Sequence, residues 1–193
     1  RLDSIGASLG TDQTRTNVFY TSTDTATGAL SGRLQETYEN AGEKWVQYQY
    51  DSSGRVSRRR EQFGDCGRTA ADSACRVTEF SYAYTDLNAD TTADNITIET
   101  RSVLGQVVSR TVEVWFEGDA ASSVFGVYRR KWLATAADLT LTDPAAILAA
   151  PGTLITKSGY YSTSDVLKSG RECFSLTPDR QLRITEYSAN GLT

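Results

Sequence analysis

A short polar segment of the sequence carries oxygen ligands at alternating positions, an arrangement that could bind a hard cation. Positions 1, 3, 5 and 9 of a calcium-binding loop are filled here by Asp86, Asn88, Asp90 and Asp94. Thr91, however, stands where such a loop needs glycine, and Thr97 stands where it needs a bidentate glutamate. No cofactor is therefore expected as a requirement, and the segment is either a calcium loop or a polar hairpin loop built from Asx turns.

The chain contains no histidine, which removes several classes of catalytic and metal site. Ser-His-Asp and Cys-His machinery would lack its base, and zinc, iron or copper sites with imidazole ligands would lack their donor. The three cysteines cannot form a four-thiolate site. A carboxylate pair that cleaves glycosides stays open as an alternative, but no pair stands out among the 24 acidic residues. We therefore expect a protein that is not an enzyme.

Two of the cysteines, Cys66 and Cys75, flank a segment of small and turn-forming residues, CGRTAADSAC. They could meet at the base of a hairpin loop, so the spacing favours a disulfide and, with it, an oxidising compartment. The alternative is a pair of thiols in a cytosolic protein. Cys173 lies among apolar residues in a predicted strand and is expected to be a free, packed thiol.

The charge balance argues against nucleic acid and membrane partners. The net charge is −4 and the sequence pI is about 5.0, whereas nucleic-acid binding relies on neutralising phosphates. The basic run Arg58-Arg59-Arg60 is expected to split between the two faces of a strand and to form ion pairs. No stretch approaches the roughly 18 apolar residues of a membrane helix. The chain starts at Arg1 and has no methionine, which indicates a processed or excised piece of a protein.

Apolar and polar residues alternate with a period of two along nearly the whole chain, which predicts an all-β protein. Strands are expected at 16–21, 33–38, 44–50, 55–63, 76–84, 95–102, 106–116, 124–132, 152–157, 159–163, 171–176 and 181–187. One short helix is expected near 144–150, because Asp143 can cap it, Pro144 suits its first position and Pro151-Gly152 ends it. The fold class is thus an antiparallel β-hairpin meander that forms a curled or extended repeat sheet.

A hairpin element recurs along the chain, in which an aromatic residue ends a strand and a glycine follows four residues later. These pairs are Tyr38 and Gly42, Tyr50 and Gly54, and Tyr187 and Gly191, and the same spacing separates Arg101 and Gly105. Glycine suits the positive-φ position that closes such a turn, and an Asp or Asn caps it. Consecutive hairpins of this kind would build a continuous antiparallel sheet.

The segment VQYQYDSSGRVSRR resembles the Y-x-Y-D-x-x-G-R signature of YD repeats. These repeats occur in Rhs proteins, bacterial wall-associated proteins, the cocoon-forming subunits of Tc toxins and teneurins. The signature residues are Tyr48, Tyr50, Asp51, Gly54 and Arg55. The segment FSYAYTD matches the first half through Tyr82 and Tyr84, with Asp86 shifted by one position and no Gly-Arg. The other copies keep the tyrosine-to-glycine spacing or less.

The resemblance implies a repetitive sheet of a large secreted or cell-surface protein that builds a shell, stalk or filament and catalyses nothing itself. We expect residues 1–193 to form a single YD-repeat-like domain, with insertions at 64–75, 86–95 and 117–152, as part of a longer array. The hairpin at 187–193 lacks an outgoing strand, and residues 1–6 could serve as one. The expected partners are therefore other YD repeats of the same or neighbouring chains.

A carbohydrate-binding adhesin module is the alternative function. Trp45, Trp115 and Trp132 could form a platform on which sugars stack, which would make glycans the partners. The competing interpretation is that these rings pack against the sheet, as aromatic residues on strands commonly do.

Overall fold

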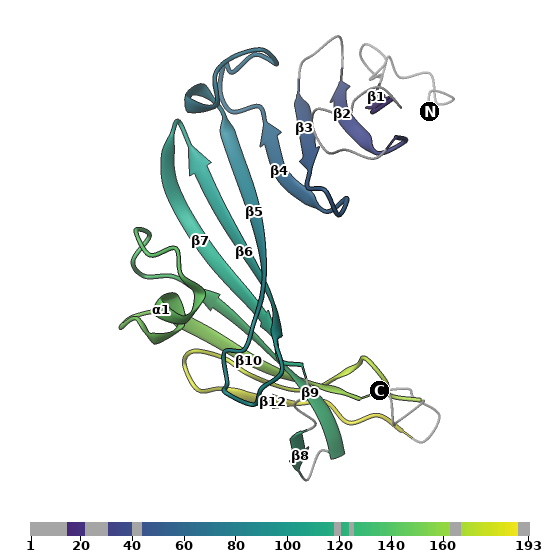
Figure 1. The fold of residues 1–193 in the computed structure, drawn as a ribbon, viewed down its shortest axis with the longest axis vertical. Coiled ribbons are helices and arrows are strands. Elements are labelled where there is room, and N and C mark those ends of the chain that lie inside the picture. Colours follow the sequence, from purple (N-terminus) through teal and green to yellow (C-terminus); the bar gives the residue numbers. More distant parts are fainter. Residues whose placement is uncertain are drawn as a thin grey trace, which may run out of the picture. The chain divides into compact units, whose positions relative to one another are not determined.

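The computed structural model describes residues 15–21, 31–39, 44–117, 121–123, 126–162 and 167–188. Within these ranges the chain is all-β and its paired strands are antiparallel, as the period-two pattern predicts. The strands (Figure 1) are β1 (Arg15–Phe19), β2 (Leu34–Glu39), β3 (Trp45–Tyr50), β4 (Val56–Glu61), β5 (Arg76–Thr85), β6 (Asp94–Val103), β7 (Gln106–Trp115), β8 (Ala121–Ser123), β9 (Gly126–Thr135), β10 (Leu154–Tyr161), β11 (Glu172–Leu176) and β12 (Leu182–Ile184).

The hydrogen-bonded strand order follows the sequence, which confirms the predicted meander. In the described residues it runs β1-β2-β3-β4-β5-β6-β7-β9-β10-β11-β12, and β8 pairs with β9. The short strand β8 had no counterpart among the expected strands. The segment 117–152, expected as an insertion, contains β8, β9 and the helix α1 (Pro144–Ala149).

Two strands expected at 152–157 and 159–163 are a single strand, β10, so that prediction was wrong. Gly159 lies inside β10, where it pairs with Arg130 of β9 and with Phe174 of β11. A Cβ atom added to Gly159 would lie 2.2 Å from Cε1 of Phe174, because the phenyl ring lies against the glycine. This glycine therefore marks close packing inside a strand rather than a turn.

The helix α1 forms where the sequence predicts it. The Asp143 carboxylate accepts a 2.8 Å hydrogen bond from the backbone N–H of Ala146, and Pro144 occupies the first turn. Ala150 is extended and Gly152 has φ +80°, so the helix ends before Pro151-Gly152. A 3₁₀ turn at Asp72–Ala74 is the other helical element of the described chain.

The structure divides into two compact units, which we describe separately. The N-terminal unit comprises residues 1–78 and 102–106, and the C-terminal unit comprises residues 79–101 and 107–193. The expectation that the whole chain forms a single domain stays a prediction.

The core of the C-terminal unit lies between strands β6, β7 and β9 and the helix α1. Its buried apolar residues are Ile96, Val112, Val114, Phe116, Ala134, Ala136 and Ile147. Arg110, which is 8% exposed, donates hydrogen bonds to the carbonyls of Leu139, at 2.6 Å, and Leu141. This arginine thereby satisfies backbone groups of the connection that leads from β9 to α1.

Candidate functional site

The YD-like segment forms the turn between β3 and β4. The Asp51 carboxylate accepts hydrogen bonds from the backbone N–H groups of Ser53 and Arg55, each at 2.9 Å, and from Nε of Arg55 at 2.8 Å. The backbone N–H of Arg55 is the main reason that the pKa of Asp51 lies below its ordinary value. Gly54 has φ +75° and donates its N–H to the Asp51 carbonyl. Asp51 and Gly54 therefore have the turn-closing roles that the sequence predicts.

Tyr50 anchors this hairpin to the start of β2. Its hydroxyl donates a 2.8 Å hydrogen bond to the carbonyl of Leu34, and burial raises its pKa. The guanidinium of Arg33 lies over the Tyr50 ring, 5.3 Å from the centroid. The Tyr20 ring meets the Tyr50 ring edge to face, with 6.1 Å between centroids, and donates its hydroxyl to the carbonyl of Tyr48.

The two ends of the connection between β1 and β2 are hydrogen-bonded to each other at Tyr20. The N–H of Gly32 donates to the carbonyl of Tyr20, and the N–H of Tyr20 donates to the carbonyl of Arg33, both at 2.9 Å. Gly32 has φ +83°. We call the set Tyr20, Gly32, Arg33, Leu34 and Tyr50 the N-terminal tyrosine clamp.

The same contacts occur a second time, in the C-terminal unit. The N–H of Gly170 donates to the carbonyl of Tyr161, and the N–H of Tyr161 donates to the carbonyl of Arg171, both at 2.9 Å. Tyr187 donates its hydroxyl to the carbonyl of Glu172 at 3.1 Å and lies beneath the Arg171 guanidinium at 5.2 Å. The Tyr161 and Tyr187 rings meet edge to face at 6.0 Å, and Gly170 has φ +73°. These residues form the C-terminal tyrosine clamp.

The two clamps show that β1, β2 and β3 correspond to β10, β11 and β12. The sequence carries the signal: Ser-Gly-Arg occurs at 31–33, 53–55 and 169–171, and FYTSTD at 19–24 parallels YYSTSD at 160–165. The tyrosine-to-glycine pattern identified Tyr50 and Tyr187 but missed their partners. A search for the recurring Ser-Gly-Arg tripeptide finds both clamp arginines and also Arg55 of the β3–β4 turn.

Two of the remaining predicted turn glycines, Gly42 and Gly191, lie outside the described residues. Gly105 has φ +77° and follows Leu104 with φ +52°, so these two residues form the loop between β6 and β7. Positive φ at both central residues is typical of a two-residue hairpin turn, which agrees with the turn role expected for Gly105.

The other predicted tyrosines do not reproduce the clamp. Tyr38 lies inside β2, with the guanidinium of Arg68 4.2 Å from its ring centroid. Tyr82 and Tyr84 both lie in β5, and Tyr84 is 65% exposed. Tyr38, which has the tyrosine-to-glycine spacing, therefore lies in other surroundings than Tyr50 and Tyr187.

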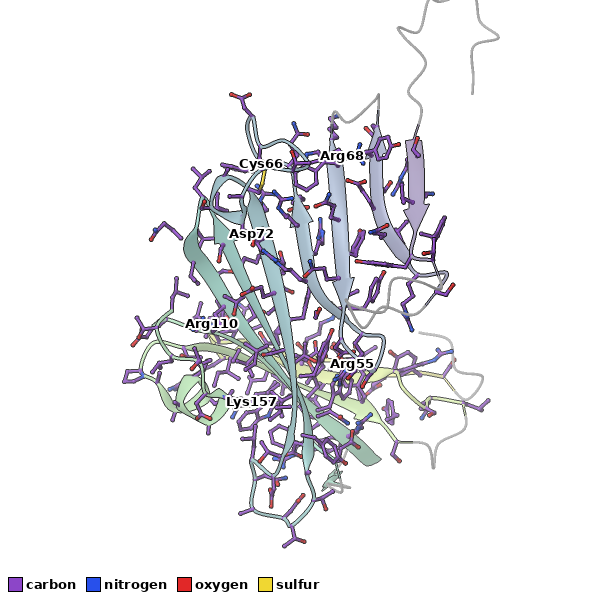
Figure 2. The ribbon with its side chains drawn as sticks, turned by 45° about the horizontal axis from the view of Figure 1, so that its top comes forward. Arg55, Cys66, Arg68, Asp72, Arg110 and Lys157 are labelled. Carbon is purple, nitrogen blue, oxygen red and sulfur yellow. A yellow bond between two sulfur atoms is a disulfide. The ribbon has the colours of Figure 1, made fainter. Side chains whose placement is uncertain are left out.

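The predicted disulfide between Cys66 and Cys75 is present, with 5.3 Å between the Cα atoms. It lies in the loop between β4 and β5 and is drawn in yellow beside Cys66 in Figure 2. Both cysteines are buried together with Trp45, whose Nε1 donates a 3.1 Å hydrogen bond to the carbonyl of Cys66. The loop 64–75 therefore covers one face of β3. Cys173 is the free, buried cysteine, and burial raises the pKa of its thiol.

Charged side chains attach this loop to the sheet. Glu36 is 5% exposed and accepts hydrogen bonds from the guanidinium of Arg68 and from the Gln47 amide. Arg60 donates to the carbonyl of Arg68 at 2.8 Å and lies over the Trp45 ring at 4.9 Å. These contacts satisfy a carboxylate that would otherwise be buried and unpaired.

The basic run divides between two faces, as predicted. Arg58 and Arg60 both form ion pairs with Asp72 of the loop, whereas Arg59 pairs with Glu61 of its own strand. The run therefore serves the structure of the N-terminal unit.

Of the calcium candidates, Asp86, Asn88 and Asp90 lie in the loop between β5 and β6, and Asp94 begins β6. The N–H groups of Asn88 and Thr92 donate to the side chains of Asp86 and Asp90, and these contacts are Asx turns. Asp94 is fully buried and accepts from the N–H of Leu87 at 2.9 Å and of Glu117 at 3.0 Å, and burial raises its pKa. Asp86 accepts from the N–H of Thr91, and Asn88 donates from its amide to Asp90. No group of three or more His, Cys, Asp or Glu residues in the described ranges could hold a metal ion.

The three tryptophans do not form a common platform. Trp45 is 2% exposed beneath the disulfide loop. Trp132 pairs with Val114, and Trp115 pairs with Lys131, so Trp115 and Trp132 point to opposite faces of the sheet. Lys157 lies over Trp132 at 4.1 Å, and Arg129 lies over Trp115 at 4.9 Å. Trp132 also packs against the apolar core, and Trp115 packs against the Tyr160 ring at 4.9 Å.

A cleft of about 420 Å³ lies in the N-terminal unit. Its lining residues are Arg15, Thr37, Glu39, Lys44, Trp45, Val46, Glu61, Gln62, Gly64 and Arg76. Glu61 pairs with Arg76 at 3.2 Å, and Arg15 donates to the Thr37 hydroxyl at 2.9 Å. Charged residues of both signs line the cleft, and Glu61 and Arg76 are paired with each other.

The chain matches no model of a known protein family, no curated protein and no solved structure. Within the described ranges, no helix is long and apolar enough to cross a membrane. The disulfide is of the kind that persists in oxidising compartments. Membership of the YD-repeat family stays a prediction, carried by the residues of the β3–β4 turn.

Proposed function

We propose that this chain is a non-catalytic structural and assembly module of a secreted or cell-surface YD-repeat protein. In this function the chain contributes a stretch of antiparallel sheet to a shell, stalk or filament, and its partners are other repeats of the same kind.

The observation that carries the proposal is the duplicated tyrosine clamp. Five contacts recur between equivalent positions more than a hundred residues apart, with the same residue type at the tyrosine, glycine and arginine positions and a backbone carbonyl at Leu34 and Glu172. Repetition of one structural unit is the design of proteins that extend by stacking or pairing similar units. In each clamp one tyrosine hydroxyl, that of Tyr50 or Tyr187, donates to a backbone carbonyl of a neighbouring strand and so joins strand ends.

The surroundings of the other chemically capable residues support a structural role. Glu36, Asp51 and Asp94 each accept at least two hydrogen bonds from neighbouring groups. Carboxylates held this way stabilise turns and loops, whereas a glycosidase needs two that face a shared substrate space.

The experiment compares the single chain with two full chains joined end to end by a short flexible linker. Because repeat modules gain stability from nearest-neighbour interfaces, the joined chains should unfold at a higher temperature than the single chain carrying the linker alone. A gain of about 1 kcal/mol corresponds to roughly 2–4 °C at this size. An unchanged unfolding temperature and a strict monomer in sedimentation would contradict the proposal.

A glycan array and a panel of glycan, peptide and ester substrates complete the test. The assembly function predicts no glycan binding and no turnover. Specific binding to one glycan class would favour the adhesin module instead. Hydrolysis that is abolished by a single carboxylate substitution would make the protein an enzyme.

A further inference from the structure

The backbone groups of β12 alternate between the edge that pairs with β11 and the outer edge. Thr185 donates its N–H to the carbonyl of Cys173, and Thr177 donates to the carbonyl of Gln181, each at 3.0 Å. Since backbone groups of successive residues in an antiparallel ladder alternate in direction, residues 181, 183 and 185 face β11. Leu182 and Ile184 direct their N–H and C=O groups to the other edge, where the strand order of the described residues ends.

The duplication shows what occupies the equivalent edge in the N-terminal unit. Counted back from the clamp tyrosines, Leu182 corresponds to Trp45 and Arg183 corresponds to Val46. The carbonyl of Trp45 accepts a 3.2 Å hydrogen bond from the N–H of Gln62, which directly follows β4. The position equivalent to Leu182 therefore carries a hydrogen bond to a neighbouring antiparallel strand.

The neighbouring strand, β4, has an acidic residue opposite the position that corresponds to Arg183. Val46 pairs with Glu61 of β4. A strand placed on β12 in the same register would therefore set its Glu61 equivalent opposite Arg183. This pair would be of the non-hydrogen-bonded kind, in which the two side chains lie closest together.

Two apolar side chains of β12 are exposed, and a neighbouring strand would cover them. Leu182 is 56% exposed and Ile184 is 48% exposed, and both point to the same face because they are two residues apart. In the N-terminal unit the corresponding face is covered at Trp45 by the loop 64–75. Arg183 is exposed and points to the opposite face, so the strand presents apolar, basic and apolar side chains in succession.

We propose that the edge of β12 binds an antiparallel β-strand with an apolar–acidic–apolar sequence, contributed by another repeat. Its acidic side chain pairs with Arg183, and its apolar side chains lie beside Leu182 and Ile184. A second β12 is the wrong occupant, because a symmetric pair centred on Arg183 would place like charges directly opposite each other. This inference rests on the proposed assembly function and specifies its partner.

The test uses the full chain and a synthetic peptide of residues 109–116, SRTVEVWF, whose Val112-Glu113-Val114 supplies the required pattern. The matched control peptide carries Glu113→Arg. Titration of the first peptide should slow hydrogen exchange at the amides of Leu182 and Ile184. The control peptide should bind about three- to tenfold more weakly, given the size of cross-strand charge effects.

A charge exchange makes the test specific. The Arg183→Glu chain should reverse the preference and bind the Glu113→Arg peptide more tightly than the original peptide. Absence of protection at Leu182 and Ile184, or the same peptide preference in both chains, would overturn the inference. Either result leaves the proposed function standing, since the joined-chain and substrate experiments test it without reference to this edge.

Discussion

The hydroxyl of Tyr50 donates a 2.8 Å hydrogen bond to the backbone carbonyl of Leu34, and so joins the end of β3 to the start of β2. The bond spans 16 residues, and its donor Tyr50 is buried whereas Leu34 is partly exposed. Its counterpart in the C-terminal unit joins Tyr187 to Glu172. These two equivalent hydrogen bonds are direct evidence that the tyrosine clamp is duplicated.

Replacing Tyr50 with phenylalanine should destabilise the N-terminal unit by about 1 kcal/mol, because the Leu34 carbonyl would lose its donor in a partly buried site. Tyr187→Phe should have a similar effect on the C-terminal unit. Urea denaturation measures both effects. Tyr48→Phe is the control, since the clamp uses the backbone carbonyl of Tyr48 and not its hydroxyl. An equal loss in the control would contradict the clamp.

Substitution of Gly159 by alanine should destabilise the C-terminal unit by about 1–3 kcal/mol through overpacking against Phe174. Phe174→Leu in the same chain should recover part of the loss, so the two changes would be less than additive. Gly67→Ala is the matched control, because a Cβ there meets nothing within 4 Å. Full additivity of Gly159→Ala and Phe174→Leu would show that the ring contact is not the cause.

The stabilising contribution of Asp51 should depend on pH. The folded state lowers the pKa of this carboxyl, chiefly through the N–H of Arg55, so its contribution is present above the unfolded pKa of about 3.9. It is lost as the pH falls through the lower folded pKa. The stability difference between the wild-type chain and Asp51→Asn should therefore shrink on acidification. Unfolding curves between about pH 2.5 and 7 measure it, and a constant difference would contradict this account.

Removal of the Cys66–Cys75 bond by a double change to serine should cost about 2–3 kcal/mol on the chain-entropy model. Hydrogen exchange should accelerate in the loop 64–75 and at Trp45, whose indole donates to that loop. The C-terminal unit should exchange as before. In the wild-type chain, alkylation under denaturing, non-reducing conditions should modify a single thiol, Cys173. Modification of three thiols would rule the bond out.

The sequence alone determined the fold class, because strand periodicity and turn chemistry are local properties. The period-two pattern placed most strands within a few residues of their observed bounds, and Asp143 with Pro144 located α1. The turn at Asp51 and Gly54 was readable for the same reason, since a side-chain cap and a positive φ act over four residues. The Cys66–Cys75 pair was also close enough in sequence to predict.

Only the tertiary structure decided which distant residues meet. Gly159 resembles a strand break in the sequence, and only the Phe174 ring from the neighbouring strand shows why a strand needs glycine there. Trp45 and Trp115 resemble one another as exposed-platform candidates, yet a loop that returns from residue 66 buries the first. The clamp partners Arg33 and Tyr50, like Arg171 and Tyr187, are brought together by strand register, a property of pairing across the sheet that no local pattern encodes.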